Sequence, residues 1–165
     1  MIGWRLGTDA PEYTADDLAG TGAKLSGGRW NRKGTPLLYV ASSRALACLE
    51  TMVHFGVQDL PLNRYLVEID LPDDLVAAAV RFDAVANVGW DAIPEGKVSL
   101  DAGDRWAKSG TSAIMIVPSV IVPEECNYLL NPLHPDAARV RARKVRRWVY
   151  DARLVPPQAP HAWAR

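Results

Sequence analysis

The sequence predicts an α+β fold in one domain, with a mixed or antiparallel sheet and flanking helices. Short apolar segments typical of strands recur along the chain, at residues 36–41, 64–71 and 112–119. A helical pattern lies between the first two, at residues 44–55. The length of 165 residues is enough for one domain with its own core, and we find no repeat or low-complexity linker.

The first elements can be placed from local signals. Residues 4–6 are expected to form a short first strand. Thr14 and Asp17 have the spacing of a helix start, in which Thr14 caps and Asp17 reaches back. The glycine-rich segment 20–28 would end that helix soon afterwards. Residues 36–41 (PLLYVA) form a short apolar run, which is typical of a buried strand.

The helix at residues 44–55 has clear end signals. Ser42 or Ser43 is expected to cap its first turn, and Gly56 is expected to end it. Residues 64–71 (RYLVEIDL) alternate apolar and more polar side chains apart from one leucine, which predicts a strand.

The second half of the chain has fewer regular patterns. Residues 72–110 are rich in loop signals, with a short helix expected around residues 102–108. Residues 112–119 (SAIMIVPS) are expected to form a buried strand that stops at Pro118. Residues 119–135 are predicted to contain a strand, a turn and an irregular return.

Residues 140–154 are ambiguous, but valine, tryptophan and tyrosine favour a strand with a basic outer face. Such a face could bind nucleic acid or an acidic partner, with Trp148 and Tyr150 available for stacking. The alternative is the solvated face of an edge strand, where charges block pairing with other strands. The balance of 19 basic and 19 acidic residues favours the edge strand. The basic residues are Arg139, Arg141, Arg143, Lys144, Arg146 and Arg147.

Composition also narrows the class of protein. Two cysteines, Cys48 and Cys126, are too few for a disulfide framework, and no apolar run approaches the length of a membrane span. We therefore expect a cytoplasmic protein with free thiols. His54, His134 and His161 show no metal-ligand spacing with the cysteines, so no metal site is expected.

Glu50 stands out because it falls on the apolar side of its helix. Leu46, Leu49 and Val53 form one stripe at helical spacing, and Glu50 lies four residues after the first and three before the last. A carboxylate that faces a core must be paired, protonated or directed into a cleft. The alternative is a glutamate at the edge of the stripe that reaches water, and the helical wheel leaves both open.

Four other residues have both a structural and a functional interpretation. Arg29 follows two glycines, which allow close approach of a ligand, and its guanidinium suits phosphate oxygens; it could also be a surface arginine in a turn. The spacing of a P-loop is absent. The structural interpretation of Tyr39 is an aromatic residue of the core. Ser119 and Asn127 would be turn residues, and no G-x-S-x-G motif surrounds Ser119 to make it a nucleophile.

Taken in order, these residues resemble a known family. The stretches GAKLSGGRWNRKGTPLLYVASSRALACLE (residues 22–50) and VPSVIVPEECNYLLNP (residues 117–132) are similar to the RES domain family. The resemblance extends over about residues 4–154, so residues 1–165 are interpreted as a single RES domain with a C-terminal tail at 155–165. The family is named for an arginine, a glutamate and a serine, which here correspond to Arg29, Glu50 and Ser119.

The resemblance implies a fold like that of ADP-ribosyltransferases that use an arginine, a tyrosine and a glutamate. It also implies an activity that consumes NAD⁺. Some members of the family release nicotinamide by hydrolysis or phosphorolysis, and some transfer ADP-ribose to a protein. The implied catalytic residues are Glu50, Arg29 and Tyr39, and the implied substrate-binding residues are Arg29, Tyr39, Ser119, Asn127, Arg5 and Trp30.

Each implied role has a physical reason. Arg29 would hold the anionic pyrophosphate, with help from Arg5. Tyr39 would stack against the cationic nicotinamide ring or its ribose. Glu50 would stabilise the positive charge that develops on the ribose as the N-glycosidic bond breaks.

Ser119 would hydrogen-bond the nicotinamide or its ribose, and Asn127 would brace the pocket. The implied partner is an Xre-type antitoxin with a helix-turn-helix domain, through which any contact with nucleic acid would be indirect. NAD⁺ is implied as a substrate, with no tightly bound cofactor, and a homodimer stays open. We expect a toxin that degrades free NAD⁺ and arrests growth; the alternatives are an ADP-ribosyltransferase with a specific protein target and a nucleic-acid-binding module.

Overall fold

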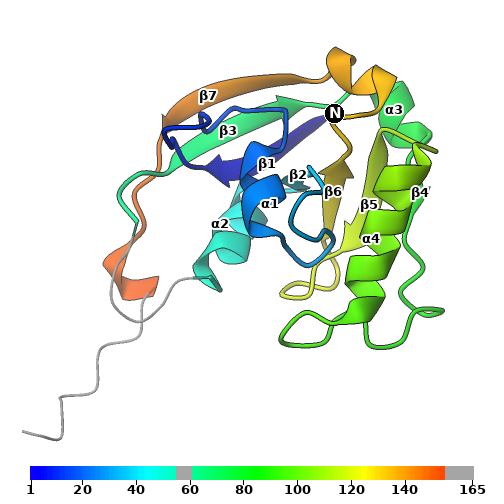
Figure 1. Cartoon of the computed structure of the whole chain (residues 1–165). Coiled ribbons are helices and arrows are strands. Elements are labelled where there is room, and N and C mark those ends of the chain that lie inside the picture. The colour runs from blue at the N-terminus through cyan, green and yellow to red at the C-terminus, as the bar shows by residue number, and fades with distance from the viewer. Residues whose placement is uncertain (55–60, 155–165) are drawn as a thin grey trace, which may run out of the picture.

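The computed structural model describes residues 1–54 and 61–154 of the chain (Figure 1). The strands are β1 Ile2–Gly7, β2 Leu38–Ala41, β3 Tyr65–Asp70, β4 Val80–Arg81, β5 Ile114–Pro118, β6 Cys126–Leu130 and β7 Arg141–Arg147. The helices are α1 Thr21–Ser26, α2 Arg44–Met52, α3 Asp73–Ala77 and α4 Lys97–Ser109, with short 3₁₀ helices η1 Pro135–Arg139 and η2 Ala152–Leu154.

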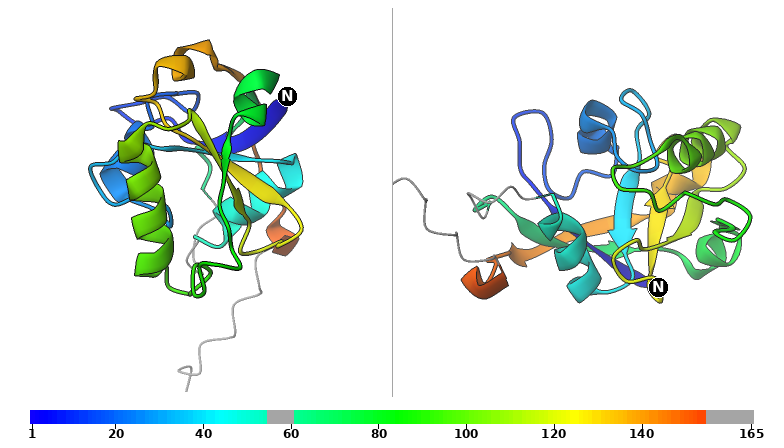
Figure 2. Two further views of the ribbon diagram at one scale, coloured as in Figure 1. Left: turned by 90° about the vertical axis from the view of Figure 1, so that its right-hand side faces the viewer. Right: turned by 90° about the horizontal axis from the view of Figure 1, so that it is seen from below.

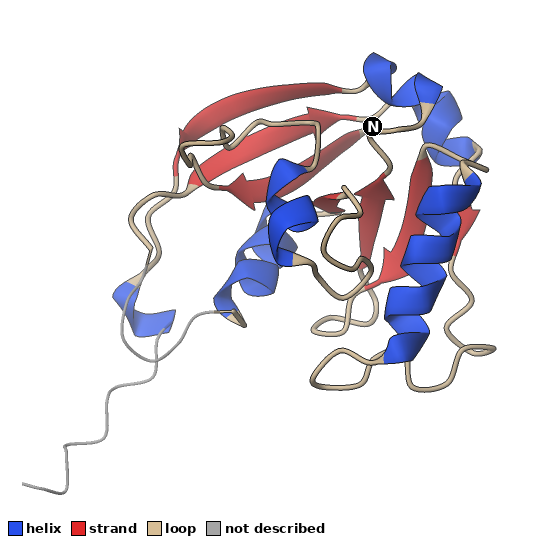
Figure 3. Cartoon of the chain, viewed as in Figure 1, coloured by secondary structure: helices blue, strands red, loops and turns tan. Residues whose placement is uncertain are grey.

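The strands form one mixed sheet in the order β4-β5-β6-β2-β1-β3-β7. The short pair β4 and β5 is parallel, and every other neighbouring pair is antiparallel. Strands β1, β3 and β7 run across the direction of β5 and β6, so the sheet is strongly twisted (Figure 3). The α+β fold predicted from the sequence is confirmed.

Alternation along β2 separates the two faces of the sheet. Leu38 and Val40 point into the largest core cluster, which also receives Leu75 of α3 and the fully buried Ala15. Tyr39 and Ala41 alternate with them and therefore lie on the other face.

That other face has two separate clusters, each formed by one helix. We call the first the α2 cluster, in which Leu46 and Ala47 contact Trp4, Leu6 and Ala41. The second is the α4 cluster, in which Trp106 packs with Trp30, Leu37, Met115, Val117 and Leu129. The helices α2 and α4 stand apart from each other (Figure 2), so polar residues can occupy the same face between the two clusters.

The prediction of a helix that begins at Thr14 is wrong. The backbone N–H of Asp17 donates to the Thr14 carbonyl in a turn, and the Asp17 carboxylate instead accepts from Ala19 and Thr21, where α1 begins. The segment stays in turns because Ala15 is buried against the backbone of Gly7, where a Cβ would lie 2.3 Å from the Ala15 carbonyl oxygen.

The helix α2 begins as predicted, with the Ser43 hydroxyl accepting the Leu46 N–H at 3.1 Å. The helix ends at Met52, earlier than the predicted end at Gly56, which itself lies outside the described residues. The expected apolar stripe is only partly correct, because Leu46 is fully buried but Leu49 is 37% and Val53 61% exposed. The buried residues of α2 lie in its first half, so the predicted apolar stripe extends too far along the helix.

Two segments of the second half differ from expectation. The helix expected around residues 102–108 is longer and spans α4, where Gly103 allows the helix to touch the Trp30 carbonyl. Residues 119–125 form a turn instead of a strand, because the Ser119 hydroxyl accepts the N–H groups of Ile121 and Val122. The strand is β6, which follows that turn.

The basic segment forms the edge strand β7, as the charge balance favoured. Arg139, Arg143 and Lys144 pair with the carboxylates of Asp74, Glu68 and Asp9. Arg141 and Arg147 donate to backbone carbonyls, and Arg146 lies over the Trp148 ring. The chain itself therefore supplies partners for these cations.

Candidate active site

Three segments distant in sequence meet at Glu50. The Ser119 hydroxyl donates to its Oε1 at 2.9 Å, and the Asn127 side-chain amide donates to the same oxygen at 2.6 Å. Glu50 lies in α2, Ser119 directly after β5 and Asn127 in β6. The interpretation of Glu50 as a paired carboxylate is therefore confirmed over that of one that only reaches water.

The Ser119 hydroxyl has no hydrogen left for a substrate. It donates to Glu50 and accepts from the backbone N–H groups of Ile121 and Val122, at 3.0 and 3.1 Å. One donor and two acceptor positions are the whole capacity of a hydroxyl. Ser119 is also only 1% exposed. Its contacts hold Glu50 and the following turn and leave no hydroxyl hydrogen for the expected bond to the nicotinamide.

Glu50 is half-buried, and its two oxygens differ in their contacts. Oε1 is held by two donors, whereas no hydrogen bond to Oε2 is found within residues 1–54 and 61–154. Asn127 braces Glu50, as the resemblance implied, but from within a strand and not from a turn. The geometry leaves Oε2 available to a ligand.

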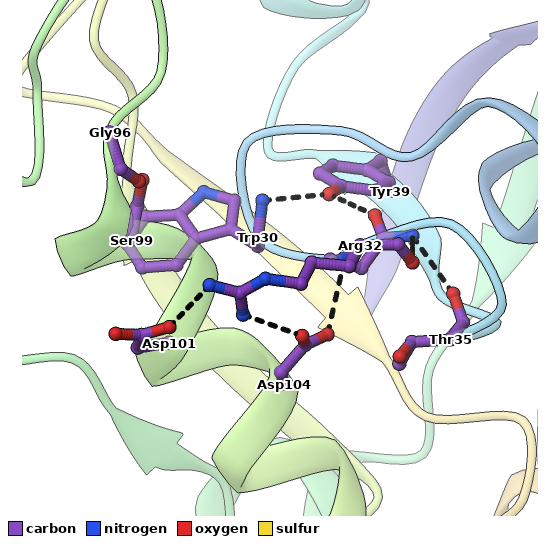
Figure 4. A network of polar contacts seen from close by, with 9 residues as sticks. Trp30, Arg32, Thr35, Tyr39, Gly96, Ser99, Asp101 and Asp104 are labelled. Atoms are coloured by element: carbon purple, nitrogen blue, oxygen red, sulfur yellow. Dashed lines mark hydrogen bonds and ion pairs between the residues drawn. The ribbon is translucent and has the colours of Figure 1, made fainter.

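Tyr39 lies on the same face of the sheet as Asn127. In the register of β2 and β6, Tyr39 is opposite Leu129 and Ala41 is opposite Asn127, so the two polar side chains project from positions two residues apart. The Tyr39 hydroxyl accepts the Trp30 N–H at 3.0 Å and donates to the Asn31 side chain at 2.7 Å (Figure 4). Burial raises the pKa of the Tyr39 phenol well above its usual range, so it stays a donor.

Arg29 has no carboxylate partner among the described residues. One guanidinium nitrogen, Nη1, donates to the backbone carbonyls of Trp90 and Ala92 at 3.0 and 2.9 Å. Carbonyl groups orient a guanidinium but do not neutralise it, so Nε and Nη2 can still bind an anion. Arg29 directly precedes Trp30, whose backbone N–H donates to the Tyr39 hydroxyl, so the two residues lie in one region.

Asn31 organises the loop that carries Arg29, and the sequence analysis did not single it out. It is fully buried, donates to the carbonyls of Ala23 and Thr35 at 2.9 and 2.8 Å, and accepts from Tyr39. Gly28 is needed beside it, because a Cβ there would lie 2.7 Å from the Tyr39 hydroxyl oxygen. The available signal was the asparagine of the motif GGRWN.

A second unpredicted contact fastens the same loop to α4. The Arg32 guanidinium pairs with Asp104 at 2.8 Å and with Asp101, and the Arg32 N–H donates to Asp104 (Figure 4). Burial by itself would raise the pKa of Asp104, but the hydrogen bonds from Arg32 outweigh it and hold that pKa below its usual range. We call this contact the Arg32–Asp104 clamp.

Two residues expected to bind substrate lie elsewhere. The Trp30 side chain is only 3% exposed and stacks on Trp90 at 6.0 Å, so it belongs to the core. Arg5 lies between Trp4 and Leu6 of the α2 cluster and therefore projects from the opposite face of the sheet from Tyr39. Burial there lowers the pKa of Arg5 to about 10, against the opposing charge of Asp17.

No group of three or more histidine, cysteine, aspartate or glutamate residues placed to hold a metal ion occurs in the described part of the chain. Within these residues no helix is long and apolar enough to span a membrane. Cys48 and Cys126 are free thiols, and burial raises the pKa of Cys48.

Comparisons with known proteins agree with one another. The family model described as RES domain matches residues 2–152. A protein of Sphingobium sp. (strain YBL2) named "Prs ADP-ribosylating toxin" is 58% identical over 153 residues, which cover 92% of this chain and 95% of that protein. Proteins named "Toxin Res" show 38% identity in Photorhabdus laumondii, over 82% of this chain and 85% of that protein, and 35% in Pseudomonas putida, over 93% and 99%.

The family match extends from β1 to β7. It therefore includes the elements that carry Glu50 and its two donors, and the loop that carries Arg29. The relatives also align over most of their own length, so the similarity concerns whole chains and not an isolated motif. The chain therefore belongs to the RES domain family.

Proposed function

We propose that this chain is an NAD⁺-consuming toxin that cleaves the nicotinamide N-glycosidic bond and transfers the ADP-ribose to a protein. The observation that carries the proposal is the Glu50 carboxylate, which is anchored through one oxygen and available through the other. The relative named "Prs ADP-ribosylating toxin" supports a protein acceptor over the degradation of free NAD⁺ that we first expected. On that relative's name, Prs is the acceptor to test.

In this proposal, Arg29 and Tyr39 prepare the site for the dinucleotide. The free nitrogens of Arg29 would contact the pyrophosphate, because a guanidinium already oriented by two carbonyls loses little freedom on binding an anion. Tyr39 would offer its ring to the nicotinamide or ribose, since its hydroxyl is committed to the loop.

Glu50 would act at the bond that breaks. As the C1′–nitrogen bond lengthens, its electron pair leaves with nicotinamide, which becomes neutral, and positive charge develops on the ribose. Oε2 of Glu50 would stabilise that charge, while Ser119 and Asn127 hold the carboxylate through Oε1. The acceptor then forms a bond to C1′ and loses its proton to solvent.

A second candidate uses the same bond with a smaller acceptor. Water would give hydrolysis of free NAD⁺, and inorganic phosphate would give phosphorolysis. The names of the relatives called "Toxin Res" include no protein acceptor and are compatible with this second candidate. Glu50 would have the same role in either reaction.

The test uses NAD⁺ labelled in its adenylate half, the purified chain and the Prs protein of the Sphingobium strain. We expect label on Prs together with released nicotinamide, and a loss of at least about 100-fold in Glu50→Gln because charge stabilisation is lost. Glu125→Gln is the matched control, since Glu125 binds Ser42 and Ser43 beside the same helix and should leave the rate nearly unchanged.

The outcomes separate the candidates. Nicotinamide release that needs Prs supports transfer to a protein, whereas fast release with phosphate or water alone supports degradation of free NAD⁺. A folded wild-type chain that releases no nicotinamide under any of these conditions would contradict both.

We also propose the partner and place of action that the resemblance implies. A helix-turn-helix antitoxin would bind the chain, cover the site and be its only route to nucleic acid, in the cytoplasm where NAD⁺ is abundant. Co-expression of such an antitoxin should restore growth that the chain alone arrests. Growth arrest that persists with the bound antitoxin would contradict the proposal.

A further inference from the structure

The segment between β4 and α4, residues 83–95, carries unusually exposed apolar side chains. Val85, Val88 and Ile93 are 89%, 85% and 84% exposed, more than any other large hydrophobic residue in the described ranges. In Figure 1 this green segment runs along the lower right of the molecule and leads into α4. Several exposed aliphatic side chains on one short segment are typical of a contact surface.

The segment has an ordered internal structure. The Asp83 carboxylate accepts the N–H groups of Val85 and Ala86 at 3.0 Å each, and the Asn87 side chain donates to the Asp83 carbonyl at 2.7 Å. The Trp90 N–H donates to the Asn87 carbonyl. These bonds hold the exposed aliphatic side chains on a defined backbone, which lowers the entropy lost when a partner binds.

The segment is also connected to the candidate active site. Trp90 stacks on Trp30 in the core, and its carbonyl accepts from Arg29 together with that of Ala92. A molecule bound to this segment would therefore lie beside the residue proposed to hold the pyrophosphate of NAD⁺.

The charge of the segment indicates the chemistry of its partner. From residue 82 to residue 96 the chain contains Asp83, Asp91 and Glu95 and no lysine or arginine. None of these three forms an ion pair with another described residue, and Asp91 and Glu95 are exposed. The complementary surface is an apolar patch with basic residues around it.

We infer that residues 83–95 form the docking surface for the protein acceptor, which binds through such an apolar and basic patch. The inference rests on the proposed transfer of ADP-ribose to a protein. It assigns recognition of the acceptor to a segment separate from the residues that act on NAD⁺.

The test compares two double variants that each remove two exposed aliphatic side chains. Val85→Ser with Val88→Ser changes the segment, and Ile93 is left in place because its neighbour Ala92 contacts Arg29. Leu62→Ser with Val149→Ser is the matched control, since these residues are 73% and 75% exposed away from the segment. Both are assayed with the Prs protein for ADP-ribose transfer, and without it for basal nicotinamide release.

We expect the KM for Prs to rise about tenfold or more in the segment variant, because the apolar contact is lost. Basal nicotinamide release should stay within about twofold of wild type, since the residues that hold NAD⁺ are unchanged. The control variant should match wild type in both assays. Asp91→Lys should also raise the KM for Prs, by repelling the basic surface.

Transfer to Prs that is unchanged in the segment variant would overturn the inference while the proposed function stands. If the variant instead changes the oligomeric state in sedimentation, or the affinity for an antitoxin, with transfer unchanged, the segment serves a second copy or the antitoxin and the inference is overturned. A wild-type chain that releases nicotinamide but labels no protein would overturn the inference and protein transfer together, leaving bond cleavage intact.

Discussion

At the scale of single residues, the carboxylate of Glu50 is prepared by contacts that leave one oxygen free. Ser119 and Asn127 both donate to Oε1, so the side chain is fixed before a substrate arrives. Preorganised groups avoid reorganisation at the moment of reaction, and this is how electrostatic stabilisation contributes most to a rate. In the proposed function, Ser119 is accordingly a positioning residue and Glu50 the catalytic residue.

This division predicts the behaviour of Ser119→Ala. We expect kcat for nicotinamide release to fall about tenfold or more, because Glu50 loses one of its two anchors. KM for NAD⁺ should change little, since the Ser119 hydroxyl has no contact left to offer the substrate. The variant should also lose about 1 kcal/mol of stability, because two partly buried N–H groups lose their acceptor.

Steady-state kinetics and thermal unfolding measure both effects. Ser42→Ala is the control, because it also removes a hydroxyl that donates to a glutamate, Glu125, and should keep kcat near that of wild type. A KM effect that exceeds the kcat effect would show that Ser119 contacts the substrate.

At the scale of elements, the loop from Gly27 to Thr35 is fixed by contacts with two elements, the strand β2 and the helix α4. Tyr39 of β2 reaches the loop through Trp30 and Asn31, and the Arg32–Asp104 clamp fastens it to α4. Arg29 projects from this loop, so its position depends on contacts that it does not itself make.

The close approach of Gly28 to Tyr39 predicts a coupled pair of variants. Gly28→Ala should cost about 1–3 kcal/mol of stability, because its Cβ would lie 2.7 Å from the Tyr39 hydroxyl oxygen. In a Tyr39→Phe background that oxygen is absent, so the added cost of Gly28→Ala should be smaller. A double-mutant cycle of unfolding free energies measures the coupling, and strictly additive effects would contradict this contact.

The Arg32–Asp104 clamp predicts a dependence of stability on pH. The pKa of Asp104 is lower in the folded chain than its unfolded value of about 4. Its contribution to stability is therefore present above about pH 4 and is lost as the pH falls through the lower folded value. We expect Asp104→Asn to be less stable than wild type at pH 7.

Asp104→Asn should also lose less stability on acidification than wild type does, since the titrating group is gone. Thermal unfolding at a series of pH values from about 7 to 2.5 measures the difference. Asp101→Asn is the control, because Asp101 is half-exposed and binds the same arginine. Parallel curves for wild type and Asp104→Asn would show that the clamp adds no pH-dependent stability.

At the scale of the whole molecule, the cations of the basic segment at residues 139–147 have partners within the fold. Three of these cations pair with the carboxylates of Asp9, Glu68 and Asp74, the others donate to backbone carbonyls, and the chain has no net charge. Nucleic-acid binding relies on cations that are free to replace the counterions of phosphate. The fold therefore does not favour the alternative of a nucleic-acid-binding module.

We expect the chain alone to bind a labelled DNA duplex weakly, with no saturation at micromolar protein in about 0.15 M salt. Fluorescence anisotropy across a salt series measures it. Tight binding with a steep salt dependence, weakened by Arg143→Ala, would restore that alternative and would make β7 its surface.

Local patterns were sufficient for much of the fold. Apolar and β-branched runs predicted the strands at residues 36–41, 64–71 and 112–119, and Ser43 was one of two predicted caps of α2. The mixture of strand and helix patterns predicted the α+β class, and the length predicted a single domain. These features depend on neighbours a few residues apart, which a sequence displays directly.

The contacts of the site were decided by the tertiary structure. The bonds from Ser119 and Asn127 to Glu50 join residues 69 and 77 positions apart, and no local pattern encodes such a distance. Strand register placed Arg5 on the opposite face from Tyr39, and packing against α4 buried Trp30. The residue types were legible in the sequence, but which of them meet depends on how the sheet pairs and which face each helix covers.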